Sequence, residues 1–259
     1  MHAIAALWKR EILKFFRDRS RVIGALGQPL GFWLLLGFGF QGAFRMPGTD
    51  ATTPVDYRAF LFPGVIAMVI LFTALFSTIS MVEERKSGFL QAALVAPVPR
   101  LALVFGATLG GTTLALLQAL LFLLLLPLTG LSPTPAGLTM LLPACLCLGV
   151  AFTALGVTVA WRMDSTRGFH AVMNLVLLPM WLLSGAVFPL SGVATPLRWV
   201  MLANPVTYGV TALRHALHAP GTVPDAFTSP AVALGVSAAF AVAMLLLATR
   251  TARRPLFAA

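Results

Sequence analysis

Residues 101–161 read LALVFGATLGGTTLALLQALLFLLLLPLTGLSPTPAGLTMLLPACLCLGVAFTALGVTVAW, a run of 61 residues without one charged side chain. About 20 apolar residues, each rising about 1.5 Å along a helix, cross the hydrocarbon core of a bilayer, so this run is too long for a single span. Proline and glycine gather near its middle, at positions 127, 130, 133, 135 and 137. Because these residue types interrupt helices and favour turns, we predict two membrane helices, at 101–128 and 137–161.

Four further uncharged runs are long enough to cross a bilayer, at 22–44, 59–82, 168–190 and 226–249. The composition agrees with membrane insertion, because 59% of the residues are hydrophobic and only 10% are charged, against about 25% charged in soluble domains. We therefore predict an all-α integral membrane protein with six transmembrane helices, built as a single transmembrane domain over residues 1–259.

One apolar stretch is too short to be a seventh span. It runs for 15 residues between Arg198 and Arg214 and is interrupted by Asn204 and Pro205. A segment of that length cannot cross the hydrocarbon core. We predict a re-entrant or interfacial helical hairpin at 196–218, on the outer side between spans five and six.

The basic residues divide unequally between the two sides of the membrane. Cytoplasmic loops carry an excess of Lys and Arg, so the richer side, which holds both ends of the chain, is predicted to be cytoplasmic. Their grouping in short clusters between apolar runs also argues against a nucleic-acid-binding stripe. Fourteen lie on the richer side, namely Lys9, Arg10, Lys14, Arg17, Arg19, Arg21, Arg85, Lys86, Arg100, Arg162, Arg167, Arg250, Arg253 and Arg254, and four on the other, namely Arg45, Arg58, Arg198 and Arg214.

Residues 1–21 have the pattern of an amphipathic helix lying in the cytoplasmic interface. Apolar residues recur at intervals of three and four, and charged residues fill the remaining arc. Two interpretations stay open, a simple interfacial anchor and a surface that a cytoplasmic partner also touches. The apolar positions are Ile4, Leu7, Trp8, Ile12, Phe15 and Phe16, and the charged ones are Lys9, Arg10, Lys14, Arg17 and Asp18.

The six predicted spans contain no Asp, Glu, Lys or Arg. Transporters driven by ion or proton gradients normally place such a group inside the membrane. The chain has only three lysines, and none follows the glycine-rich loop that cradles nucleotide phosphates. If the protein transports, we expect its energy to come from a partner. Polar side chains within the spans, such as Gln28, Gln118 and Asn174, are expected to make interhelical hydrogen bonds or to line a pore.

Candidate metal or catalytic groups are few. Cys145 and Cys147 lie two residues apart on a predicted helix, which points them in different directions, so we interpret them as packing residues. His215 and His218 share a helix face but have no acid close to them in the sequence, which makes a poor metal site. We predict no metal site and no catalytic residue.

The segment 83–100 is the most distinctive cytoplasmic loop. It begins with Glu83-Glu84-Arg85-Lys86-Ser87-Gly88-Phe89, continues through an apolar stretch to Val95 and ends with Pro97-Val98-Pro99-Arg100. Paired acids followed by bases suit a short helix docked in a groove of another protein. The alternative is a solvated connector whose charges mark the interface.

This loop resembles the cytoplasmic coupling loop of the type 2 family of ATP-binding-cassette exporter permeases. A second block, Leu183-Ser184-Gly185-Ala186-Val187-Phe188-Pro189, then Pro196-Leu197-Arg198-Trp199, then Asn204-Pro205-Val206-Thr207-Tyr208 through Ala212-Leu213-Arg214, is similar to that family's signature after the fifth helix. The resemblance extends over essentially the whole chain. One departure is Thr211, where relatives often have an acid, and this bears on how Arg214 is paired.

The resemblance implies a multi-pass permease subunit in the inner (plasma) membrane of a bacterial cell. Such a subunit dimerises, here with another copy of this chain, and sits on two copies of a cytoplasmic ATPase. By the same resemblance, the chain is not catalytic by itself and binds no cofactor, because ATP and Mg belong to the partner ATPase.

The resemblance also implies which residues meet the partner. Those that would contact the ATPase are Glu83, Glu84, Arg85, Lys86, Gly88 and Phe89, together with Lys9, Arg10 and Lys14 on the N-terminal helix. Those that would shape the outer hairpin are Gly185, Phe188, Pro189, Asn204, Pro205, Tyr208 and Arg214.

The implied function is outward movement of an amphiphilic or lipophilic substrate such as a drug, lipid or glycan-type molecule. A polytopic membrane scaffold or assembly factor that transports nothing would share the topology and is the alternative. Small residues four apart, Gly27 with Gly31 and Gly106 with Gly110, allow close helix approach, either between two copies or within one subunit.

Overall fold

The computed structural model describes residues 2–17, 19–40, 56–86 and 99–253, the side chains of residues 2 and 19–26 excepted. Within these ranges the chain is helical and has no β-strand, so the all-α prediction is confirmed there. Five helical segments of this part are long and apolar enough to cross a membrane, namely Tyr57–Lys86, Arg100–Leu123, Pro135–Ala160, Thr166–Ala186 and Pro230–Arg253.

These segments correspond to most of the labelled helices. Tyr57–Lys86 consists of α3 (Tyr57–Ser77) and α4 (Ile79–Lys86), and Thr166–Ala186 consists of α8 (Thr166–Trp181) and the π-helical turn η2 (Leu182–Ala186). The other three are α6 (Arg100–Leu123), α7 (Pro135–Ala160) and α11 (Pro230–Arg253). The first predicted span, 22–44, coincides in part with α2 (Arg19–Gly39). Part of it lies outside the described residues, so a sixth span stays a prediction.

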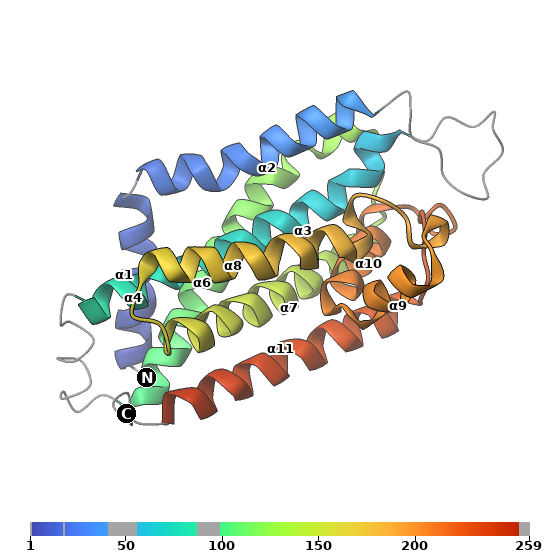
Figure 1. Ribbon diagram of the computed structural model, residues 1–259. Coiled ribbons are helices and arrows are strands. Elements are labelled where there is room, and N and C mark those ends of the chain that lie inside the picture. Colours follow the sequence, from blue (N-terminus) through green and yellow to red (C-terminus); the bar gives the residue numbers. More distant parts are fainter. Residues whose placement is uncertain (1, 18, 41–55, 87–98, 254–259) are drawn as a thin grey trace.

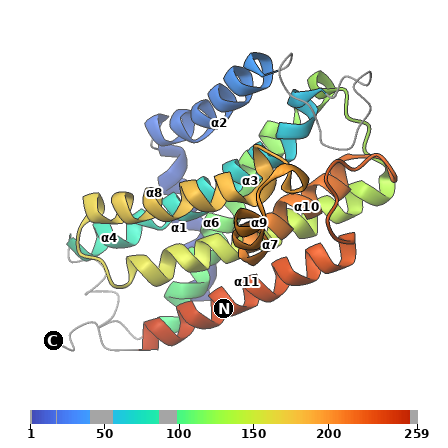
Figure 2. The ribbon, with the colours of Figure 1, turned by 45° about the vertical axis from the view of Figure 1, so that its right-hand side comes forward.

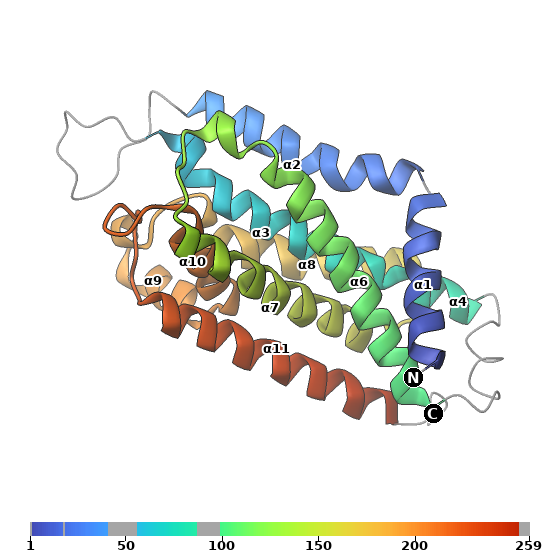
Figure 3. The same cartoon turned by 180° about the vertical axis from the view of Figure 1, so that it is seen from behind.

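The long helices run side by side, and α1 (His2–Arg17) lies across them at one end of the bundle (Figures 1 and 3). The end of α4 and the end of α11 lie at this same end, which we call the α1 end. The short helices α9 (Thr195–Ala203) and α10 (Pro205–Leu217) lie at the opposite end, which we call the α10 end (Figure 1). Figure 2 shows α10 from a second direction, again away from α1. The long apolar helices therefore connect an end that carries α1 with an end that carries α9 and α10.

The central helix is α3, because 17 of its 21 residues are buried. It packs against α2, α6, α7, α8 and α10. A helix that is apolar on every side belongs inside a bundle rather than on its surface. Only the turn at Thr78 separates it from α4, so the helical path reaches from Tyr57 to Lys86, past the end of the predicted span at 82.

Polar residues set the helix starts. Thr134 caps α7 by accepting a hydrogen bond from the Gly137 amide at 3.1 Å, and Pro135 occupies the first helical position. Ser165 caps α8 in the same way. Between α6 and α7 the chain forms the 3₁₀ turn η1 (Leu126–Thr129) and then Gly130 with a φ of 71°. The cluster of Pro and Gly near residue 130 thus separates two helices.

Buried polar groups link the central helices. The Thr73 hydroxyl on α3 donates to the Gln118 side-chain oxygen on α6, and both residues are buried. Such bonds between helices are expected where no water can satisfy the groups. Gln118 therefore makes the interhelical bond that the sequence predicts for polar residues inside spans.

Candidate functional site

At the α1 end, α1 is seated directly on α6. A Cβ atom at Gly106 would lie 2.7 Å from the Leu7 Cβ, and one at Gly110 would lie 2.8 Å from the Glu11 Cβ. The Trp8 indole donates to the Thr113 hydroxyl at 3.1 Å. The two glycines thus let α1 approach α6 within one subunit, which was one of the two roles left open for them. Gly27 and Gly31 on α2 have nothing within 4 Å of such a Cβ.

Five charged side chains link α1 to α4, and we call them the α1–α4 charge cluster: Arg10, Glu11, Lys14, Glu83 and Glu84. Arg10 donates to the Glu84 carboxylate and, at 3.0 Å, to Glu11. The Lys14 amine lies 3.3 Å from the Glu84 carboxylate and 3.8 Å from that of Glu83. Burial alone would lower the pKa of Arg10, but hydrogen bonds and charge attraction from Glu84 and Glu11 outweigh it and raise that pKa.

Arg85 connects the same end of α4 to the turn after α7. Its guanidinium donates to the Trp161 carbonyl, to the Met163 carbonyl at 3.3 Å and to the Asp164 carboxylate at 2.6 Å. A cation is stabilised beside the carbonyls at a helix C-terminus. The last turn of α4 is therefore held on two sides, by α1 through Glu84 and by the α7–α8 turn through Arg85.

The predicted ATPase-contact residues are thus divided in the structure. Glu84, Arg85, Arg10 and Lys14 lie together at the α1 end and make pairs inside the chain. Lys9 and Lys86 are exposed. Gly88, Phe89 and the rest of the predicted loop up to 98 lie outside the described residues.

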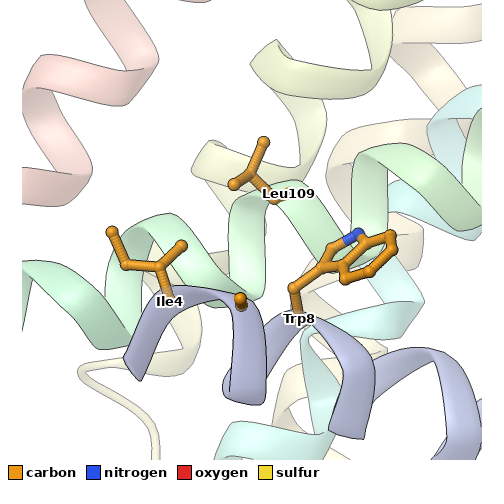
Figure 4. Close-up of a pocket in the computed structure, with 4 residues that line it drawn as sticks. Ile4, Trp8 and Leu109 are labelled. Atoms are coloured by element: carbon orange, nitrogen blue, oxygen red, sulfur yellow. The ribbon is translucent and has the colours of Figure 1, made fainter. Parts of the chain in front are cut away.

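An apolar pocket of about 360 Å³ lies between α1 and α6 (Figure 4). It is lined by Ile4, Ala5, Trp8 and Leu109, none of which carries a charge. The pocket offers apolar contact alone. It has the character expected of a helix lying at a membrane interface, where tryptophan is common.

At the α10 end, α8 stops in a bulge. The residues Leu182–Ala186 form a π-helical turn, and Gly185 has a φ of 77°, which only glycine adopts without strain. This geometry interrupts the helical hydrogen bonds and leaves carbonyl groups to be satisfied by other donors. Inside a membrane an unsatisfied carbonyl is costly, so such a break needs side-chain partners.

Side chains from other segments supply those partners. The Asn204 amide donates to the Met180 carbonyl at 2.6 Å and to the Leu183 carbonyl at 3.1 Å. The Tyr57 hydroxyl on α3 donates to the Val187 carbonyl at 2.9 Å, and the Arg214 guanidinium donates to the Gly185 carbonyl. We call the three donor residues Asn204, Tyr57 and Arg214, together with Gly185 and with Asp225, which is described next, the bulge junction. It unites predicted hairpin residues with residues far away in the sequence.

Arg214 is the most deeply buried charge of the described residues, with 1% of its surface exposed. Its guanidinium lies 4.3 Å from the centre of the Phe60 ring and 3.8 Å from the Asp225 carboxylate. Asp225 in turn accepts hydrogen bonds from the Leu190 amide and, at 3.1 Å, from the Ser191 amide. Asp225 therefore faces Arg214 from the segment before α11.

The other residues predicted for the outer hairpin include two prolines at the starts of helical elements and a tyrosine in an aromatic contact. Pro189 precedes the 3₁₀ turn η3 (Leu190–Gly192), and Pro205 is the first residue of α10, which Asn204 caps. The Tyr208 ring packs edge-on against Phe227 at 5.4 Å, and Phe188 is half-buried. Pro189 and Pro205 thus mark the starts of helical elements, and a hairpin-shaping role for these residues stays a prediction.

The histidines beside Arg214 bind backbone groups. The His215 ring pairs with the Thr228 carbonyl at 2.9 Å and the His218 ring with the Arg214 carbonyl at 3.0 Å. Across the described residues, no three His, Cys, Asp or Glu side chains gather in a way that could hold a metal ion.

Sequence reasoning missed Tyr57, Phe60 and Asp225 as members of this end. Nothing in the sequence around Tyr57 or Phe60 connects them to Gly185 or Arg214. Asp225 did leave a signal, because it is the only acid after Asp164 and follows Arg214 by eleven residues. Asp225 could therefore have been proposed from the sequence as a counter-ion for Arg214.

Comparison with known proteins identifies the class. A family model described as ABC-2 type transporter matches residues 2–218, and the chain belongs to that family. The resemblance seen in the sequence is therefore confirmed. The chain is 27% identical to a protein named Nodulation protein J from Rhizobium leguminosarum bv. viciae over 262 residues, covering 97% of this chain and 94% of the relative. It is also 27% identical to a Putative transport permease ycf38 from Porphyra purpurea over 215 residues, covering 82% of this chain and 72% of the relative.

The chain is thus a transport permease of the ABC-2 family, with several apolar helices suited to a multi-pass membrane protein. Permeases of this family normally pair with an ATP-binding subunit. Membership of this family means that the general role of the helix bundle described above is transport.

Proposed function

We propose that this chain is the membrane subunit of an exporter that dimerises, forms a substrate pathway and is driven by a separate cytoplasmic ATPase present in two copies. The observation that carries the proposal is the distribution of charge. In the five described spans, Asp, Glu, Lys and Arg occur only in the terminal turns. A transporter without charges at the membrane centre lacks the usual site for coupling to an ion gradient, so its energy comes from a partner.

The α1 end is the proposed cytoplasmic face. It carries α1, α4, Arg85 and the arginines at the end of α11, in keeping with the excess of basic residues in cytoplasmic loops. In this proposal both termini are cytoplasmic in the inner membrane of a bacterial cell, and α2 is the sixth span. The α9–α10 hairpin re-enters the membrane from the outer side, next to the bulge junction, which satisfies carbonyl groups at the end of α8 and in the bulge.

ATPase contact is proposed at the last turn of α4 and the loop that follows, to Arg100. Because Glu84 and Arg85 hold α4 to α1 and to the α7–α8 turn, a push on this segment would reach α1, α6, α7 and α8 together. ATP and Mg would be bound by the ATPase. Uncharged spans favour an amphiphilic or lipophilic substrate, a drug, lipid or glycan-type molecule, moved outward.

The test of this function uses the complete complex. We expect the purified chain alone to hydrolyse no ATP, and the chain co-expressed with its cassette ATPase in proteoliposomes to hydrolyse ATP and move a lipophilic cargo. A phospholipid with a fluorescent label is a suitable first substrate, alongside fluorescent amphiphilic drugs. A chain that binds no ATPase subunit and leaves all cargo in place would instead support the membrane scaffold.

A second copy is proposed to cover the face formed by α2 and α8. These helices flank α3 (Figure 1), and the Phe32 ring on α2 contacts Trp181 at the end of α8. The amides Gln28 and Asn174 are exposed on this face, among large apolar side chains such as Leu35 and Leu175, at 77% and 76% exposure. Exposed amides in lipid are unfavourable, so a partner copy or a polar pathway is expected to shield them.

Cross-linking tests this face. In a background with Cys145 and Cys147 replaced by alanine, Leu175→Cys is expected to give a covalent dimer with a short bifunctional thiol reagent in native membranes. Leu246→Cys on α11, where the leucine is also exposed at 52%, is the matched control and is expected to stay monomeric. Equal cross-linking at both positions, or none at 175, would contradict the proposed dimer face.

A further inference from the structure

Within the bulge junction, Arg214 joins three separate segments of the chain. Arg214 comes from α10, Gly185 from the bulge after α8, and Asp225 from the segment between α10 and α11. Asp225 also binds the backbone of η3 through the amides of Leu190 and Ser191. One charged pair therefore ties the bulge, η3, α10 and the segment before α11 into a single contact.

The pair is shielded from water. The side chains of Arg214 and Asp225 are 1% and 4% exposed, and the Phe60 ring lies against the guanidinium. Removing one member of a buried pair leaves an uncompensated charge, which is far more costly than losing an exposed ion pair. Breaking the Arg214–Asp225 pair is therefore energetically costly, and we expect the pair to be intact in most molecules.

The local backbone is built around Asp225. Its φ is 51°, the only positive φ outside glycine among the described residues. Aspartate tolerates this conformation better than most residues, at some cost. The conformation is maintained because the carboxylate meets two backbone amides and the guanidinium at once.

We propose that Arg214 and Asp225 form a latch that holds the 218–229 segment against η3 and closes the α10 end of the bundle. While the pair is intact, Asp225 holds the Leu190 amide, and the Leu190 side chain stays buried beside Gly185, at 2% exposure. When the pair is broken, the segment is released and Leu190 becomes accessible to water. The proposal does not depend on the transport proposal, because its test needs neither an ATPase nor a substrate.

The test measures labelling of a cysteine introduced at position 190. The full chain carries Leu190→Cys in a background with Cys145 and Cys147 replaced by alanine, and is treated in detergent with a polar maleimide. We expect Asp225→Asn to raise the labelling rate about tenfold or more, because the open form becomes more populated. Ser191→Cys, at the exposed neighbouring position, controls for reagent access and is expected to label quickly with or without Asp225.

A relocated acid separates a latch from a simple counter-ion. Thr211 is buried one turn before Arg214 on α10, so an aspartate there can face the guanidinium without binding the 218–229 segment. In Thr211→Asp combined with Asp225→Asn, we expect the melting temperature to recover part of the loss caused by Asp225→Asn, while labelling at position 190 stays fast. Labelling that Asp225→Asn does not raise, or that the relocated acid returns to the original rate, would overturn the latch.

Discussion

Gly111→Ala is expected to lower the melting temperature of the purified protein by about 3–10 °C, a large effect for a single added methyl group. Gly111 lies on α6 and faces side chains of both α3 and α7. An added Cβ would collide with the Ser77 hydroxyl on α3 and lie 2.5 Å from the Thr153 methyl group on α7. Overpacking of this kind costs roughly 1–3 kcal/mol when neighbours must shift.

Neither neighbour can move freely. The Ser77 hydroxyl donates to the Ala74 carbonyl at 2.7 Å, and the Thr153 hydroxyl donates to the Gly149 carbonyl at 2.7 Å. Rotating either side chain breaks a hydrogen bond inside the bundle, where water cannot replace it.

The matched control is Gly235→Ala on α11, where nothing lies within 4 Å of the added Cβ. Alanine is a better helix former than glycine by about 1 kcal/mol, so this variant is expected to melt at the same temperature or slightly higher. Thermal unfolding in detergent, followed by circular dichroism, compares the two. A Gly111→Ala protein as stable as its control would show that the three helices do not meet closely at Gly111.

Glu84→Lys is expected to abolish stimulation of ATP hydrolysis by the permease in the assembled complex. In the unsubstituted chain, Arg10 and Lys14 share the Glu84 carboxylate. The substitution replaces this carboxylate with a third cation. A hydrogen bond to a charged group contributes about 1.5–3 kcal/mol. Because like charges also repel, the contact between α1 and the last turn of α4 is expected to weaken. A loss of that size corresponds to about a tenfold or larger fall in the fraction of molecules in which this contact is formed.

Charge exchange provides the decisive comparison. Arg10→Glu combined with Glu84→Arg restores opposite charges between α1 and α4 and is expected to recover much of the stimulation. Arg17→Glu, an exposed position of α1 outside the α1–α4 charge cluster, is the control for a general change in charge. Full stimulation in Glu84→Lys, measured as phosphate release per complex, would contradict a role for this pair in coupling.

The helices themselves could be predicted from the sequence because their signals are local. Runs of about 20 uncharged residues, and Pro and Gly between them, decide where a membrane helix can exist whatever its neighbours are. The apolar stretch between Arg198 and Arg214 could be distinguished from the membrane spans for the same reason, because it is too short. In the structure it belongs to two short helices, α9 and α10, which meet at Asn204.

Pairing between segments could not be predicted in the same way. The sequence predicts that the charged residues around Glu83 and around Lys9 lie on the same side of the membrane, but only the packing of α1 across α6 brings Arg10 next to Glu84 on α4. The same applies to the carbonyls freed at Gly185, whose partners come from α3, Asn204 and α10.

By itself the sequence determined a helical membrane protein, the positions of its apolar runs and, through the resemblance of two segments, its family. The length of an apolar run and the charges that flank it are properties of one chain segment, so they can be recognised before the tertiary structure is known. The tertiary structure alone decided which charges neutralise one another and which donors satisfy the broken end of α8. Those choices depend on distances of a few ångströms between residues far apart in the sequence, and close helix packing fixes them.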